Sequence, residues 1–138
     1  MRTFVIAALA IAGMTAGAIA ADVEAKFLGA ATYSSAKGCS QLKALASGTP
    51  RNLNTVPETL TAKGYLGWEG GCAIERIAEQ VKGKRWTVSL RCSEGAVENQ
   101  RHQETWEKAP DGAILISFKK KRERYVACPV VPAPEKNK

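Results

Sequence analysis

The sequence has a single histidine, His102, and lacks the short motifs that mark several large enzyme classes. No G-x-S-x-G nucleophile elbow occurs, so a serine hydrolase of the α/β type has no nucleophile site. A P-loop and a G-x-G-x-x-G fingerprint are also missing, which leaves nucleotide chemistry without a motif. Without a C-x-x-C pair, a closed zinc site would need four scattered thiolates, and thioredoxin-like redox chemistry has no reactive pair. We therefore expect neither a metal nor a cofactor.

Long apolar runs are confined to the first residues. A basic start at Arg2, an apolar run from Phe4 to Ala12 and an A-x-A pattern ending at Ala20 predict a cleavable secretory signal peptide over residues 1–20. A transmembrane anchor is the alternative, but glycines interrupt the run before it reaches the roughly 20 apolar residues that a span needs. No later stretch is long enough, so we expect a periplasmic or secreted protein without a transmembrane segment after signal removal.

The chain that remains is short and basic. Residues 21–128 suit a single domain with one modest core, whereas the proline-rich and charged residues 129–138 are expected to be a disordered tail. The full sequence has 20 Lys and Arg against 13 Asp and Glu, a net charge of +7. This charge indicates a weak preference for anionic surfaces, although a merely well-solvated surface explains it equally. Specific nucleic-acid binding is not expected.

A period-2 pattern on either side of Gly83 predicts a β-hairpin formed by residues 72–79 and 85–93. Folding the pattern about residue 82 puts apolar side chains on one face and mostly polar side chains on the other. The expected cross-strand pairs are Cys72 with Cys92, Ile74 with Leu90, Arg76 with Val88, and Ala78 with Trp86.

Two further turns continue this up-and-down order. The sequence Ala-Pro-Asp-Gly at 109–112 is typical of a hairpin turn, and a basic turn follows at 119–122. The strands that these turns join span 101–108, 113–119 and 123–128. The expected pairs are Trp106 with Ile116, Glu104 with Phe118, Ile116 with Tyr125, and Ile114 with Ala127.

An even number of cysteines in a small exported chain predicts disulfides rather than free thiols. The strand order places Cys128 on the order of 20 Å from Cys72 and Cys92, whereas bridged Cα atoms lie within about 7 Å. This favours the pairs Cys72 with Cys92 and Cys39 with Cys128. Ahead of the hairpins only Ser40–Ala46 looks helical. The predicted fold is mainly β, a small antiparallel β-meander or half-barrel with one short N-terminal helix and two disulfides.

Four short motifs follow one another between Thr61 and Cys128. They are Gly-Trp-Glu-Gly-Gly-Cys at 67–72, Cys-Ser-Glu-Gly at 92–95, Asp-Gly at 111–112 and Tyr-Val-Ala-Cys at 125–128. In these motifs the segment resembles small two-disulfide periplasmic or secreted domains of proteobacteria. The resemblance implies export and a small β fold, and it transfers no catalytic residue.

His102 is the one candidate general base near neutral pH. With Glu104 as an acid and Arg101 as a cation for phosphate, it matches the needs of a small secreted ribonuclease. Its strand parity equals that of Glu104 and Trp106, so the alternative is a packed or solvent-exposed histidine near the rim of the core face. Glu104 and Glu107 have opposite parity, which argues against a glycosidase pair.

Basic side chains gather at two of the predicted turns. They fit contacts to phosphate or lipopolysaccharide that weaken with salt, but lysine-rich turns also keep hairpin tips soluble. The candidate binding residues are Lys119, Lys120, Lys121, Arg122, Arg124, Lys82, Lys84 and Arg85.

These features favour an exported, non-enzymatic binding domain of the cell envelope that contacts anionic envelope components or a protein partner. One alternative is an inhibitor of a secreted or periplasmic hydrolase or protease, because a rigid disulfide-locked domain loses little entropy on binding. A second alternative is a small secreted hydrolase that uses His102.

Overall fold

The structure is a computed structural model that describes residues 23–48, 56–67 and 69–129. The predicted signal peptide over 1–20 and, apart from Pro129, the predicted tail over 129–138 lie outside these residues and stay predictions. In the described part of the chain, no helix has both the length and the apolar character to cross a membrane.

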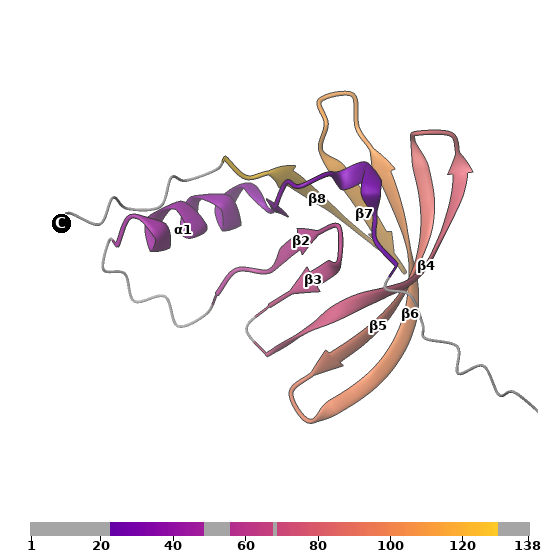
Figure 1. The fold of residues 1–138 in the computed structure, drawn as a ribbon, viewed down its shortest axis with the longest axis horizontal. Helices are drawn as coiled ribbons and strands as arrows, with labels where there is room; N and C mark the ends of the chain where they lie inside the picture. Colours follow the sequence, from indigo (N-terminus) through magenta and orange to yellow (C-terminus); the bar gives the residue numbers. More distant parts are fainter. Residues whose placement is uncertain (1–22, 49–55, 68, 130–138) are drawn as a thin grey trace, which may run out of the picture.

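Eight antiparallel strands follow one another around a closed barrel, and one helix lies outside the ring (Figure 1). The elements are η1 (Lys26–Leu28), β1 (Tyr33–Ser34), α1 (Ala36–Ala46), β2 (Thr59–Thr61), β3 (Gly64–Leu66), β4 (Gly70–Val81), β5 (Arg85–Glu94), β6 (Val97–Lys108), β7 (Ile114–Phe118) and β8 (Lys121–Ala127). The mainly β prediction is confirmed. The meander or half-barrel is corrected to a closed barrel, because β1 pairs with both β2 and β8 and completes the ring.

The three strands β1, β2 and β3 lie ahead of the predicted hairpins, where the sequence predicts only the helical segment Ser40–Ala46. They are two or three residues long, too short for a period-2 pattern to emerge. Gly64 shows why the chain can turn there: its φ is +125°, and a Cβ atom would collide with the carbonyl oxygen of Cys72. Only glycine fits such a position without strain.

The first predicted hairpin forms with the expected register at its open end. Cys72 lies opposite Cys92 and Ile74 opposite Leu90, but a bulge after Ile74 shifts the remaining pairs. The expected pairs Arg76 with Val88 and Ala78 with Trp86 are therefore wrong. The observed pairs beyond the bulge are Arg76 with Ser89, Ile77 with Val88, Ala78 with Thr87 and Glu79 with Trp86. The extra residue of a bulge reverses strand parity, which keeps Ile77 against the core and leaves Arg76 exposed.

The later hairpins agree with the prediction in part. Trp106 lies opposite Ile116 as expected, and this ladder ends at Thr105 and Ser117 without reaching the expected pair of Glu104 with Phe118. The last turn comes one residue earlier than predicted, at Lys119 and Lys120, where Lys119 takes a left-handed conformation with φ at 53°. The observed pairs are consequently Ile114 with Tyr125 and Ile116 with Glu123. The expected pairs Ile116 with Tyr125 and Ile114 with Ala127 are wrong by two residues, which preserves the face of each side chain.

Both predicted disulfides are present. Cys72 joins Cys92 across β4 and β5, and Cys39 on α1 joins Cys128 just after β8. The helix begins at Ala36 rather than Ser40, because the Ser35 side chain caps it by accepting a hydrogen bond from the Gly38 amide at 3.0 Å. Two disulfides fit a chain that folds in an oxidising compartment.

Aromatic side chains fill the interior of one half of the barrel, and the segment with η1 covers it. Phe27 in η1 stacks on Trp86 with ring centroids 3.7 Å apart and meets Trp106 edge-on at 6.3 Å. The Ala25 amide anchors this segment by donating to the Ala62 carbonyl at 2.7 Å. Trp106, which has no exposed surface, meets Tyr65 edge-on on its other side, at 5.8 Å. Beyond Tyr65 the packing of the interior is incomplete.

Candidate functional site

The incompletely packed half of the barrel holds a cavity of about 460 Å³. A wider cleft of about 1000 Å³ adjoins it and shares with it Tyr65, His102 and Phe118, so the cavity leads towards the surface. The residues lining the cavity are Glu58, Tyr65, Cys72, Glu94, His102, Glu104, Ile116, Phe118, Lys121, Glu123 and Tyr125. Aromatic walls with a few converging polar groups are typical of a small-molecule site.

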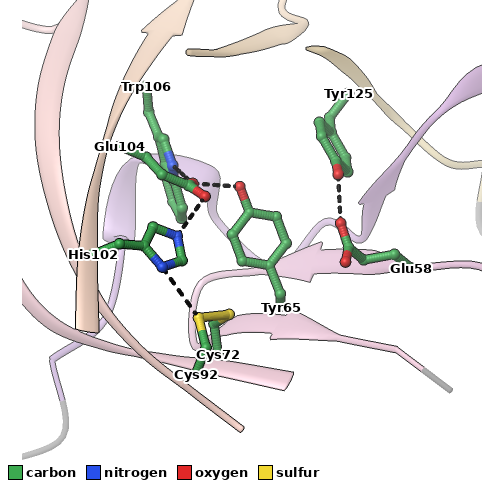
Figure 2. Close-up of a disulfide and its surroundings, with 8 residues drawn as sticks. All are labelled: Glu58, Tyr65, Cys72, Cys92, His102, Glu104, Trp106 and Tyr125. Atoms are coloured by element: carbon green, nitrogen blue, oxygen red, sulfur yellow. Dashed lines mark hydrogen bonds and ion pairs between the residues drawn. A yellow bond between two sulfur atoms is a disulfide. The ribbon is translucent and has the colours of Figure 1, made fainter. Parts of the chain in front are cut away.

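The first polar group in this cavity is built around Glu104, which is only 9% exposed (Figure 2). Its Oε2 atom accepts hydrogen bonds from the Tyr65 hydroxyl and from Trp106 Nε1, both at 2.7 Å. Its Oε1 atom lies 3.0 Å from His102 Nε2. Bonds to a carboxylate are stronger than bonds between neutral groups, so this one side chain orients an aromatic ring from β3 and two from β6.

His102 lies on the interior face of β6 beside Glu104. Its Nδ1 atom is 3.7 Å from Cys92 Sγ, and its ring centroid is 4.5 Å from that of Phe118. Arg101 points to the outer face, where it pairs with Glu75 at 3.1 Å. The structure thus brings together the histidine and acid of the ribonuclease hypothesis, pairs its cation Arg101 with Glu75, and places Lys121 in the cavity with them.

The second polar group is the pair of carboxylates at Glu58 and Glu123. The Tyr125 hydroxyl donates to Glu58 Oε1 at 2.6 Å and lies 3.3 Å from Glu123 Oε2. Figure 2 shows the contact between Tyr125 and Glu58. A hydroxyl carries one proton, so a single donor serves two carboxylates. In the parts of the chain that the structure describes, neither Glu58 nor Glu123 has an ion pair with a basic side chain.

Sequence reasoning did not identify Glu58, Tyr65, Glu123 and Tyr125 as members of one site. Glu58 precedes β2, which carries no strand pattern, and Tyr65 lies in a strand of three residues. Tyr125 was expected beside Ile116, whereas the observed register puts Glu123 there. The run of Lys and Arg at 119–122 contains no Gly, Asn or Asp that would mark Lys119 as the left-handed residue of the turn.

The predicted basic binding residues lie at both ends of the barrel and form no single surface. Lys82, Lys84 and Arg85 belong to the turn between β4 and β5, where Arg85 pairs with Glu107 at 3.3 Å. Arg124 pairs with Asp111. The remaining group, at the turn between β7 and β8, comprises Lys119, Lys120, Lys121 and Arg122. No ion pair joins these four to a carboxylate among the described residues, and Lys119 lies over the Phe118 ring at 5.3 Å.

Burial raises the pKa of Tyr65 and of Tyr125 well above the ordinary tyrosine value, because the tyrosinate would lose its hydration. The carboxylate of Glu104 adds to this effect at Tyr65, and those of Glu58 and Glu123 add to it at Tyr125. Both hydroxyls therefore stay protonated in the folded protein and act as donors at neutral pH.

Raising the pH above 10 should destabilise the fold. Both tyrosines ionise near pH 10.0 in the unfolded chain but not in the folded chain, so above that pH the unfolded state binds fewer protons. The free energy of unfolding should be unaffected by these groups below pH 10 and fall above it, by up to about 1.4 kcal/mol per pH unit for each such tyrosine. Urea titrations across this range measure the slope, which Tyr65→Phe and Tyr125→Phe should each reduce. Tyrosinate absorbance from both residues ahead of unfolding would contradict the account.

Among the residues described, no three His, Cys, Asp or Glu side chains gather closely enough to hold a metal ion. Comparison with known protein families, curated proteins and solved structures yields no match to this chain. The resemblance to two-disulfide proteobacterial domains therefore stays a prediction, and the function has to be argued from the cavity itself.

Proposed function

We propose that this chain is an exported, non-enzymatic binding domain that holds a small ligand in the cavity of its incompletely packed half, called the open half of the barrel below. The observation that carries the proposal is the cavity of about 460 Å³, whose polar side chains already orient one another through hydrogen bonds. A site that is ordered before binding loses little entropy when the ligand arrives. The signal pattern and the two disulfides support a periplasmic or secreted location.

Binding is favoured over hydrolysis because the polar groups beside His102 are already engaged. Glu104 accepts from Tyr65 and Trp106 and lies 3.0 Å from His102 Nε2, and Arg101 pairs with Glu75. A hydrolase would also need a cation or oxyanion donor, and Lys121, which lines the same cavity, is the candidate that remains. Incubating the purified protein with RNA and with ester and peptide substrates should give no turnover, whereas turnover lost in His102→Ala would support the hydrolase alternative.

The test of the binding proposal is a thermal-shift screen of the protein, purified after export, against small metabolites of all charge classes. Ile116→Phe should fill the cavity, since Ile116 lines it and is 5% exposed. The adjacent Leu115→Phe makes the same kind of change at a half-buried position that does not line the cavity and serves as the control. A ligand at 100 times its Kd stabilises a protein by about 2.7 kcal/mol, so hits should raise the Tm by several degrees.

The shift should occur in the parent protein and in Leu115→Phe and disappear in Ile116→Phe. Each variant is first checked for its own folded spectrum, because an enlarged core side chain also costs stability. Shifts of equal size in all three proteins, or no shift with any compound, would overturn the proposal.

A second candidate function is contact with an anionic envelope surface through the turn between β7 and β8. Its support is that Lys119, Lys120, Lys121 and Arg122 have no ion pair with a carboxylate among the described residues. Co-sedimentation with anionic vesicles should then weaken with salt and in the triple variant Lys119→Ser, Lys120→Ser, Arg122→Ser. Equal sedimentation of the parent and the triple variant would count against this candidate.

A further inference from the structure

We propose that the ligand of the cavity is a small organic cation with several N–H donors, such as a primary ammonium or a guanidinium group. Its charged end would lie between Glu58 and Glu123, beside the Tyr125 hydroxyl. This inference rests on the proposed binding function and names the chemical class of the ligand.

The charge of the cavity lining has the opposite sign to the net charge of the whole chain. The sequence has a net charge of +7. The charged or titratable side chains that line the cavity are Glu58, Glu94, Glu104, Glu123, Lys121 and His102. Four carboxylates against one lysine and one histidine leave the lining negative, and such a cavity attracts cations and repels anions.

The buried carboxylate of Glu104 is bound by protein groups, whereas Glu58 and Glu123 are exposed and their remaining acceptor positions face solvent. Glu104 accepts from Tyr65 and Trp106 and lies 3.0 Å from His102 Nε2, so protein groups occupy most of its acceptor positions. Glu58 and Glu123 converge on one hydroxyl, at 2.6 and 3.3 Å. Each ionised carboxylate offers about four acceptor positions. The pair therefore has acceptor capacity for a ligand with several donors.

The lining of the cavity favours an organic cation over a metal ion. Ca²⁺ takes six to eight oxygen ligands, so water would have to supply part of a metal's shell beside the two carboxylates and the Tyr125 hydroxyl. The walls are aromatic, because Tyr65 meets Tyr125 edge-on at 6.0 Å and Phe118 also lines the cavity. Aromatic faces attract organic cations and cover their carbon chains.

The experiment is isothermal titration of the protein, purified after export with both disulfides formed, against four matched compounds at low salt. They are n-butylammonium, n-butylguanidinium, 1-butanol and butyrate, which share a carbon chain and differ in charge. Both cations should bind at least about tenfold more tightly than butanol or butyrate. Magnesium and calcium chloride are titrated in parallel and should neither bind nor displace the amine at equal concentration.

Two variants and a matched control test where the charged group of the ligand lies. Glu58→Gln and Glu123→Gln should each weaken amine binding by about tenfold, since a hydrogen bond to a charged group is replaced by a neutral one. Glu98→Gln removes the same charge from an exposed position on β6 that does not line the cavity, and it should change the affinity less than about twofold. Near-UV circular dichroism checks that each variant keeps the parent fold.

The possible outcomes separate this inference from the proposed function. Tighter binding of butanol or butyrate, with the cavity variant Ile116→Phe abolishing it, would overturn the cation class and leave the binding function standing. Preferred binding of a divalent metal, or equal effects of Glu98→Gln and Glu123→Gln, would also overturn it. If none of these compounds binds and the metabolite screen gives no shift, both proposals fail together.

Discussion

Replacing Cys39 and Cys128 together by alanine should lower the free energy of unfolding by about 4.5 kcal/mol in the chain-entropy account of disulfides. The two cysteines are 89 residues apart in the sequence, so their bond closes most of the described chain into one loop. The bond also lies beside the seam that closes the barrel, where β1 pairs with β8 through only Tyr33 with Ala127 and Ser34 with Val126. A loss of this size is a large part of the stability of a small domain.

The matched control is the removal of the other disulfide. Cys72 and Cys92 are only 20 residues apart and lie within the continuous ladder of β4 and β5, so alanine at both positions should cost about 3 kcal/mol. Urea denaturation of the three proteins gives both values. Equal losses, or a larger loss from the Cys72 and Cys92 pair, would show that the seam between β1 and β8 holds without its disulfide.

Replacing Glu104 by leucine should lower the free energy of unfolding by about 4 kcal/mol. The substitution leaves the Tyr65 hydroxyl and the indole N–H of Trp106 without their acceptor, and Trp106 has no exposed surface from which to reach water. A buried donor that loses its partner costs about 1 to 3 kcal/mol. The control, Glu107→Leu, removes only a solvent-exposed ion pair with Arg85 and should cost less than about 1 kcal/mol.

A double substitution tests whether the loss at Glu104 has this cause. Tyr65→Phe removes one donor and should cost about 1 kcal/mol by itself. In a Glu104→Leu background it should cost nothing or restore some stability, because it removes the Tyr65 hydroxyl that has lost its acceptor. Additive losses in the double variant would mean that Tyr65 and Glu104 do not depend on each other.

The sequence predicts the parts of the fold that rest on local patterns. The alternation from Cys72 to Cys92 and the Ala-Pro-Asp-Gly turn define two hairpins, and the strand order then pairs the four cysteines correctly. No residue pattern in the sequence indicates the bulge after Ile74, because the bulge becomes favourable only when Ile77 packs against the core. Closure of the barrel was not predictable for a related reason: β1 is two residues long, and its partners β2 and β8 lie far from it in the sequence.

The same contrast explains how much of the site could be predicted. The interior position of His102 follows from its parity with Trp106, because both lie on one strand. The contact of Tyr65 with Glu104 joins β3 to β6, and the contact of Glu58 with Tyr125 joins the start of β2 to β8. Such contacts exist only once the ring has closed, so no local pattern in the sequence can indicate them.

The central claim is that the open half of the barrel, rather than its basic turns, is the binding site. The most direct test is two-dimensional ¹H–¹⁵N NMR of the labelled protein during titration with n-butylammonium. The account predicts that the perturbed amides cluster at Tyr65, His102, Phe118 and Tyr125, the cavity residues contributed by four different strands. Perturbation confined to the turn at Lys82–Arg85 or to Lys119, Lys120 and Arg122, or an unchanged spectrum at saturating ligand, would contradict it.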